Sequence, residues 1–262
     1  MEVRLCSANL VRGRTVPMGW DGGGNGDEQM RRLVAVVAVG GLCMLSGACS
    51  TASSSSHKSH KTTTTTSTTT KKTAPPVAEG ALKGFLLTPE QINTAMGTTD
   101  MTVTKSRVAM PDDSATMAPR ECLAIDGAAQ AQVYAGSNFM AVRDQTLQEG
   151  DNFTHFAEQA VVLFPSAKQA DSFFKASAQK WQACHEYTHI QSKTQWTVGA
   201  IANTNGMLST IATLQNAPGE GWACGRALAV RNNVIIDVNT CSADPKNSAV
   251  DIANQIAAKV PA

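Results

Sequence analysis

The longest apolar run in this 262-residue chain is too short to cross a lipid bilayer. It covers 13 residues, from Leu33 to Leu45, whereas a membrane-spanning helix needs about 20 consecutive apolar residues. The sequence therefore predicts no membrane-spanning helix, and attachment to a membrane would need another device.

Several motifs of catalysis and metal binding are also missing. The chain has no Gly-x-Ser-x-Gly pattern, which is the nucleophile elbow of α/β-hydrolases, and no Cys-x-x-Cys pair, which is typical of thiolate zinc sites. Residues 79–262 contain 13 Lys and Arg against 17 Asp and Glu, a net charge of −4, without a basic stripe. That balance argues against a nucleic-acid partner. We expect no cofactor.

The segment from Met30 to Cys49 has the plan of a secretory signal peptide. Arg31 and Arg32 precede the apolar run, and small residues follow it directly before Cys49. A cysteine at that place is typical of bacterial lipoprotein signals, in which it is lipidated and becomes the mature N-terminus. We therefore expect a signal peptide over residues 30–48 and a lipid on Cys49, which anchors the protein on the extracytoplasmic face of the cell membrane. A plain uncleaved anchor is the alternative.

The regions on either side of the signal differ from it and from each other. Residues 1–29 are Gly-rich and partly acidic, unlike the start of a signal peptide, and we interpret them as an untranslated or disordered extension with translation starting at Met30. Residues 49–78 are almost entirely Ser, Thr, Lys and His, which predicts a disordered tether because nothing in them can be buried. The tether lysines are expected to lie against anionic lipid headgroups.

Residues 79–262 have the length of one domain. Their apolar residues recur at helical spacing in some stretches and alternate as in strands in others. Thr88-Pro89-Glu90-Gln91 and Ser166 with Gln169 are capping signals for helices that run to about Met96 and Cys184. A third helix is expected after Asp244-Pro245. Strands between and after these helices indicate an α+β fold with a central antiparallel sheet. They are predicted at about 101–108, 139–148, 153–164, 189–198, 207–215, 222–231 and 234–241.

The four cysteines of this domain predict two disulfides, because exported chains meet oxidising conditions. Asn232-Asn233 is a two-residue hairpin turn, and in that register facing residues have numbers that sum to 465. Cys224 and Cys241 satisfy this sum as a non-hydrogen-bonded pair, about 4.5 Å apart at Cα and within disulfide range. Cys122–Cys184 follows by elimination.

One stretch matches a zinc-protease motif. His185-Glu186-Tyr187-Thr188-His189 reads His-Glu-x-x-His, in which two histidines on one helical face hold Zn²⁺ while Glu activates water. The surrounding residues favour a strand, in which His185 and His189 would be about 13 Å apart, beyond the reach of one ion. We therefore expect no metal here, and keep a zinc hydrolase as the alternative.

The hairpin over 222–241 offers a candidate ligand site. Ala227, Ala229, Ile236 and Val238 point to one face and suit a core, whereas three polar residues point to the other face together with Leu228, Val230 and Ile235. A polar cluster braced by a disulfide is a candidate for one wall of a ligand-binding cleft, and an ordinary solvated face with an Arg–Asp contact is the commoner arrangement. The candidate residues are Arg226, Asp237 and Asn239.

Three stretches of the domain resemble the PknH-like extracellular sensor family of mycobacterial lipoproteins and receptor kinases. They are AVVLFPSAKQADSFFKASAQKWQAC (160–184), GWACGRALAVRNNVIIDVNTC (221–241) and the terminal SAVDIANQIAAKV helix. The resemblance implies a mixed α/β domain with a central antiparallel sheet, two sequential disulfides and an open cleft for an unknown ligand. The chain lacks the kinase's Gly-rich loop, VAIK and HRD motifs.

We therefore expect a non-enzymatic, lipid-anchored sensor or ligand-binding domain of the cell envelope. Its ligand is expected to be a small molecule, a lipid or a glycan. Two alternatives remain: a secreted zinc metallohydrolase built on residues 185–189, and an envelope or host-interaction protein that acts through its surface.

Overall fold

The computed structural model describes residues 74–219 and 221–262, which fold into an α+β domain with one large antiparallel sheet. The predicted fold class is confirmed. The predicted extension, the signal peptide, Cys49 and most of the tether lie outside the described residues.

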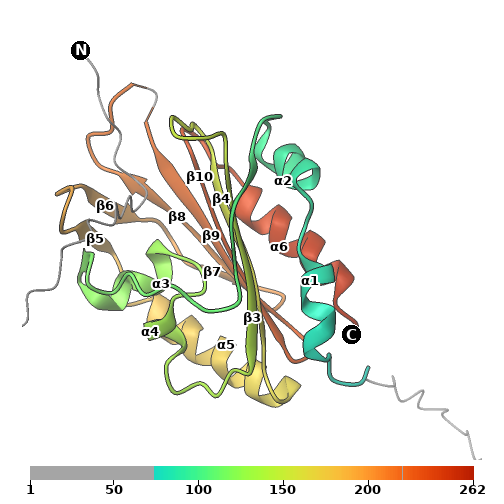
Figure 1. Ribbon diagram of the computed structural model, residues 1–262. Coiled ribbons are helices and arrows are strands. Elements are labelled where there is room, and N and C mark those ends of the chain that lie inside the picture. Colours follow the sequence, from blue (N-terminus) through green and yellow to red (C-terminus); the bar gives the residue numbers. More distant parts are fainter. Residues whose placement is uncertain (1–73, 220) are drawn as a thin grey trace, which may run out of the picture. The chain divides into compact units, whose positions relative to one another are not determined.

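The sheet has ten strands in the order β1-β3-β4-β10-β9-β8-β6-β5-β2, with β7 paired to β8 outside this order (Figure 1). Every pair is antiparallel. The strands are β1 (Thr102–Arg107), β2 (Met117–Ala118), β3 (Ala141–Gln148), β4 (Phe156–Leu163), β5 (Glu186–His189), β6 (Gln195–Val198), β7 (Ala202–Thr204), β8 (Met207–Leu214), β9 (Ala223–Arg231) and β10 (Val234–Ser242).

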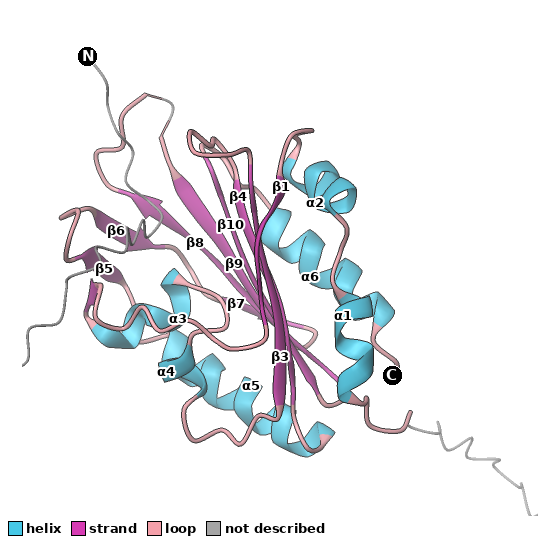
Figure 2. Cartoon of the chain, viewed as in Figure 1, coloured by secondary structure: helices cyan, strands magenta, loops and turns pink. Residues whose placement is uncertain are grey.

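Helices cover both faces of the sheet (Figure 2). On one face lie α1 (Leu82–Phe85), α2 (Pro89–Met96) and α6 (Ser248–Lys259), and on the other lie α3 (Leu123–Asp126), α4 (Ala131–Tyr134) and α5 (Ala167–Trp181). Two 3₁₀ turns, η1 (Glu79–Ala81) and η2 (Arg120–Cys122), lead into α1 and α3. Among the residues described, we find no helix with the length and hydropathy of a membrane span.

The central hairpin β9–β10 is buried on both of its faces. Ile236 and Val238 pack against the side of α6, while Ile235 and Leu228 pack against the side of α5. Since successive side chains of a strand point to opposite faces, this hairpin separates two hydrophobic cores. A sheet covered on both sides needs such continuous burial, and nearly every residue of β9 and β10 is buried.

The helix signals of the sequence are confirmed where caps define them. Thr88 accepts a hydrogen bond from the Gln91 N–H, and α2 ends at Gly97, whose φ of 74° is left-handed. Ser166 caps α5 through the Gln169 N–H in the same way. The strand expected over 189–198 is instead two strands, β5 and β6, joined by a turn in which Lys193 has a φ of 60°.

The hairpin register and both disulfides are confirmed. Cys224 and Cys241 face each other across β9 and β10, with their Cα atoms 4.1 Å apart. Cys122 and Cys184 form the second disulfide, with their Cα atoms 5.2 Å apart. The second bond fastens the segment before α3 to the segment after α5.

Residues before position 79, the domain boundary expected from composition, are already hydrogen-bonded to the domain. The Ala74 N–H donates to the Ala262 carbonyl at 3.2 Å. Asn232 Nδ2 donates to the Pro75 carbonyl at 2.8 Å, and the Val77 N–H donates to Asn233 Oδ1 at 2.7 Å. The chain therefore enters the domain beside the β9–β10 turn and the C-terminus.

Candidate functional site

A row of polar side chains crosses five neighbouring strands on the face that α5 covers. Strand register aligns one residue from each of β3, β4, β10, β9 and β8. Each of these residues is at most 6% exposed. Buried polar groups are costly unless they are hydrogen-bonded, so the partners of this row decide what it does. In strand order the row is Thr146, Glu158, Asn239, Arg226 and Thr210.

Arg226 bonds to main-chain carbonyls of the segment that covers it. Its Nη2 donates to the Ala124 carbonyl at 2.9 Å and to the Gly127 carbonyl at 3.1 Å, and its Nη1 donates to the Val238 carbonyl. Nη2 also lies 2.7 Å from Asp237 Oδ1, and both side chains are at most 3% exposed. The guanidinium is therefore occupied by this chain's own groups.

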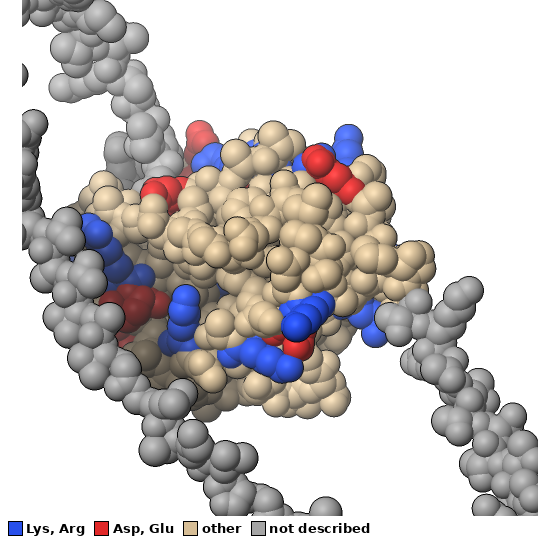
Figure 3. All heavy atoms as spheres, turned by 90° about the horizontal axis from the view of Figure 1, so that it is seen from below, with Lys and Arg blue, Asp and Glu red and all other residues tan. Residues whose placement is uncertain are grey.

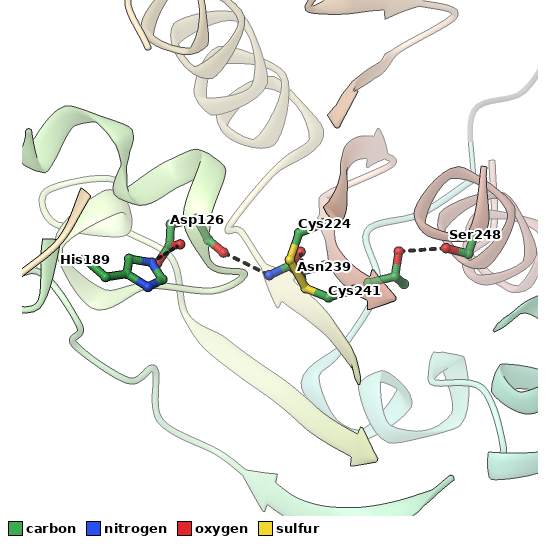
Figure 4. Close-up of a disulfide and its surroundings, with 7 residues drawn as sticks. Asp126, His189, Cys224, Asn239, Cys241 and Ser248 are labelled. Carbon is green, nitrogen blue, oxygen red and sulfur yellow. Dashed lines mark hydrogen bonds and ion pairs between the residues drawn. A yellow bond between two sulfur atoms is a disulfide. The ribbon is translucent and has the colours of Figure 1, made fainter. Parts of the chain in front are cut away.

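Asp237 and Asn239 bind the same covering segment. Asp237 Oδ2 accepts hydrogen bonds from the Ala129 N–H at 2.9 Å and from the Tyr134 hydroxyl at 2.8 Å. Burial, and after it the charge of Asp237, raise the pKa of Tyr134 well above its ordinary value, so this hydroxyl stays a donor. Asn239 Nδ2 donates to the Asp126 carbonyl at 2.8 Å (Figure 4).

The proposed cleft wall at Arg226, Asp237 and Asn239 is therefore corrected. The three side chains lie together, as expected, but they are buried beneath α3 and α4 and face neither a cleft nor solvent. The physical reason is that they satisfy the backbone of a covering segment whose helices are only four residues long each. Such short helices are not stable by themselves and need tertiary bonds.

A second cluster, with two buried carboxyl groups and a partly exposed arginine, lies at the β1 side of the row. Arg107 Nη1 lies 2.7 Å from Asp144 Oδ1 and 3.3 Å from Glu158 Oε1, so one guanidinium contacts two carboxyl groups. Burial, and after it the charge of Asp144, raise the pKa of Glu158 well above its ordinary value. Burial also raises the pKa of Asp144, against the opposing charge of Arg107. Among the described residues, Asp144 Oδ2 is buried without a hydrogen-bond partner.

The His-Glu-x-x-His stretch is extended rather than helical, as expected. His185 precedes β5 and is exposed, as is Glu186, while His189 ends the strand. His189 Nε2 lies 2.7 Å from Asp126 Oδ1 (Figure 4). Burial alone would lower the pKa of His189, but the hydrogen bond to Asp126 and its charge outweigh burial and raise this pKa. Within residues 74–219 and 221–262 no three His, Cys, Asp or Glu side chains are grouped to hold a metal ion.

Two open hollows on the surface are large enough for a small ligand. The first, of about 310 Å³, lies between the loop after α4 and α5, where Phe173 lies beside Ser137 and Lys180. The second, of about 300 Å³, lies beside the start of α6 and is lined by Ile211 and Ala249, among others. Arg226 lines the second hollow through its main chain, since its side chain points to the opposite face of the sheet.

Sequence reasoning missed the cluster of Arg107, Asp144 and Glu158 and the covering segment over α3 and α4. A signal for the cluster was present, because Glu158 and Gln159 interrupt an otherwise apolar run from Phe156 to Phe164. A polar pair inside a buried strand requires partners. No comparable signal marks α3 and α4, whose four residues each fall below the length at which periodicity can be read.

Residues 77–259 match the sequence pattern of the family described as "PknH-like extracellular domain". The chain is similar to serine/threonine-protein kinase PknH of Mycobacterium bovis and of Mycobacterium tuberculosis, with 36% identity over 190 residues in each case. These alignments cover 71% of this chain, which spans only 32% and 30% of the two kinases. The crystal structure of the extracellular domain of PknH from Mycobacterium tuberculosis superposes with a TM-score of 0.66 at 34% identity, covering 71% of this chain and 97% of that one.

Proposed function

The chain belongs to the PknH-like extracellular domain family, and we propose that it is a non-enzymatic sensor that binds a ligand outside the cytoplasm. The observation that carries this proposal is the family match, which covers nearly the whole of the described domain. The relatives are kinases about three times as long as the matched region. Their kinase activity is not assigned to this chain.

We place the protein at the extracytoplasmic face of the cell membrane, held by a lipid on Cys49. The family supports the extracytoplasmic location. The two disulfides support it independently, because disulfides persist in oxidising compartments and are rare in the cytoplasm. The anchor rests on the pattern of basic residues, apolar run and small residues before Cys49.

The bonds of the buried polar groups support a non-enzymatic role. Arg226 and Asp237 bind each other and the covering segment, and Glu158 and Asp144 share Arg107. A catalytic group has to reach a substrate atom, directly or through one water, and these groups are turned inward. The arrangement stabilises a covering segment, which is what a rigid binding scaffold requires.

The ligand we propose is a small molecule, a lipid or a glycan of the envelope, held in one of the two hollows. Thermal unfolding of residues 74–262 tests this with fractions of envelope lipids and glycans. A ligand at a hundredfold excess over its dissociation constant stabilises the folded state by about 2.7 kcal/mol. Ala176→Trp obstructs the first hollow and Val250→Trp the second, and each serves as the control for the other. We expect one variant, and not the other, to abolish the thermal shift.

Two results would contradict the proposal. If no fraction raises the melting temperature, the domain acts through its surface and the ligand claim fails. If the purified domain contains stoichiometric zinc together with a peptidase activity, and His189→Ala removes both, the chain is a metallohydrolase. We expect neither zinc nor activity, because His189 is bonded to Asp126 in a strand.

A further inference from the structure

Five basic side chains gather at one end of the domain. Arg143 is near the start of β3, Lys168 is in the first turn of α5 and Arg231 is the last residue of β9. Lys83 in α1 and Lys259 at the end of α6 complete the group. We call this surface the basic end. Figure 3 views the domain from this end and shows basic side chains, with some acidic ones among them, on a largely uncharged surface.

Hydrogen bonds to the backbone connect the elements of the basic end. The Met140 N–H donates to the Leu163 carbonyl, and the Phe164 N–H donates to the Asn233 carbonyl, so the starts of β3 and α5 lie beside the β9–β10 turn. Lys259 Nζ donates to the Leu86 carbonyl at 2.9 Å, which places the end of α6 beside α1. The five cations therefore belong to one surface rather than to separate faces.

Acidic residues are concentrated at the other end of the same strands. Glu149 and Asp151 lie in the β3–β4 connection, Asp100 precedes β1 and Asp244 follows β10. At the basic end the acidic residues are paired: Glu79 lies 2.9 Å from Arg143, and Asp171, near the start of α5, lies 2.6 Å from Lys175. The domain as a whole has more acidic than basic residues. The positive charge of the basic end is thus a local feature that the net charge of the domain hides.

The chain enters the domain at the basic end. Ala74 and Pro75 are bonded beside the C-terminus and the β9–β10 turn, and residues 49–73 join the domain there. A segment of that length reaches at most about 90 Å when fully extended. A lipid on Cys49 would therefore be linked to the domain through this end.

We propose that the basic end docks on anionic phospholipid headgroups, so that the acidic end and its loops point away from the membrane. Its setting in the cell rests on the proposed lipid anchor, but the attraction itself does not. A basic residue near an anionic bilayer contributes about 1 kcal/mol, which corresponds to about fivefold in affinity. Salt weakens such an attraction because the Debye length falls to about 8 Å at physiological ionic strength.

Vesicle binding of residues 74–262 tests the proposal without the lipid anchor. This unit contains both cores and both disulfides, and the solved relative is the corresponding extracellular domain by itself. The probes are vesicles of phosphatidylcholine alone and of phosphatidylcholine mixed with phosphatidylglycerol. We expect binding to the mixed vesicles only, and weaker binding as salt is raised.

A matched pair of triple variants identifies the surface. Lys83→Gln, Lys168→Gln and Arg231→Gln together remove three exposed charges from the basic end, and we expect them to weaken binding about a hundredfold. The control combines substitutions of three exposed lysines elsewhere: Lys105→Gln, Lys193→Gln and Lys246→Gln. It has the same net charge, so equal weakening in both variants would overturn the proposal in favour of non-specific attraction.

The remaining outcomes separate this proposal from the proposed function. If the domain does not bind phosphatidylglycerol vesicles while the full chain is lipidated and membrane-bound, the docking proposal is wrong and the proposed anchored sensor is unaffected. If the domain binds them through the basic end but Cys49 carries no lipid, docking stands and the anchor fails. Equal binding to neutral and anionic vesicles would also overturn the proposal, because charge would then not be the cause.

Discussion

Replacing Arg226 by methionine tests whether the buried polar row holds the domain together. The substitution keeps much of the side-chain volume but removes the bonds to the Ala124, Gly127 and Val238 carbonyls. It also leaves Asp237 buried without its cation. Breaking a buried ion pair from one side costs about 3–5 kcal/mol. Against a total stability of about 5–15 kcal/mol, this loss is large.

Arg231→Met is the matched control, because it makes the same replacement on the same strand at an exposed position. Surface substitutions of this kind stay within about 0.5 kcal/mol. Urea unfolding of residues 74–262, followed by tryptophan fluorescence, gives both values, with disulfides kept intact. A denaturation slope equal to that of the wild type shows that the same surface is exposed on unfolding.

A double-mutant cycle with Asp237→Asn separates the ion pair from the other bonds. Asparagine removes the charge that Arg226 neutralises, so Arg226→Met should cost less in that background, by about 0.5–3 kcal/mol. If Arg226→Met lowers stability no more than Arg231→Met does, Arg226 has no structural role and the cleft-wall hypothesis for it has to be reopened.

Three further predictions concern titration and the covalent frame. The raised pKa of Glu158 means that the folded state binds its proton more tightly than the unfolded state does, so the free energy of unfolding falls as pH rises above the ordinary glutamate range. Glu158→Gln should make this fall less steep, as measured by urea unfolding at several pH values. The raised pKa of His189 acts in the same direction: its contribution to the free energy of unfolding is complete below about pH 6.5 and is lost as pH rises through the folded pKa. His189→Gln should therefore destabilise the domain at acidic pH and have little effect at alkaline pH. Replacing Cys224 and Cys241 together by alanine opens a 17-residue loop and should cost about 3 kcal/mol in thermal unfolding; an unchanged melting temperature would contradict this.

The hairpin of β9 and β10 could be predicted in detail because its information is local. Two adjacent asparagines set the turn, and one register then fixes every facing pair, including the two cysteines. The caps of α2 and α5 are local in the same sense. Such features depend on residues within a few positions of one another, so a single sequence contains them.

The role of Arg226 could not be predicted because it depends on distant residues. Alternation along a strand shows that Arg226 and Asp237 share a face, but not whether another segment covers that face. The covering residues lie about 100 positions away in the chain, as with the Ala124 carbonyl. The pairing of Arg107 with Asp144 and Glu158 depends in the same way on the order of strands in the sheet.

Membrane attachment through Cys49 is tested most directly by the mass and partitioning of the protein made from the full chain in a mycobacterial host. We expect the mature protein to begin at Cys49, to carry the added mass of a lipid and to enter the detergent phase. Cys49→Ala should be recovered as uncleaved precursor or in the medium. A wild-type protein that begins upstream of Cys49, carries no lipid and partitions like Cys49→Ala would contradict a lipid-anchored extracytoplasmic sensor.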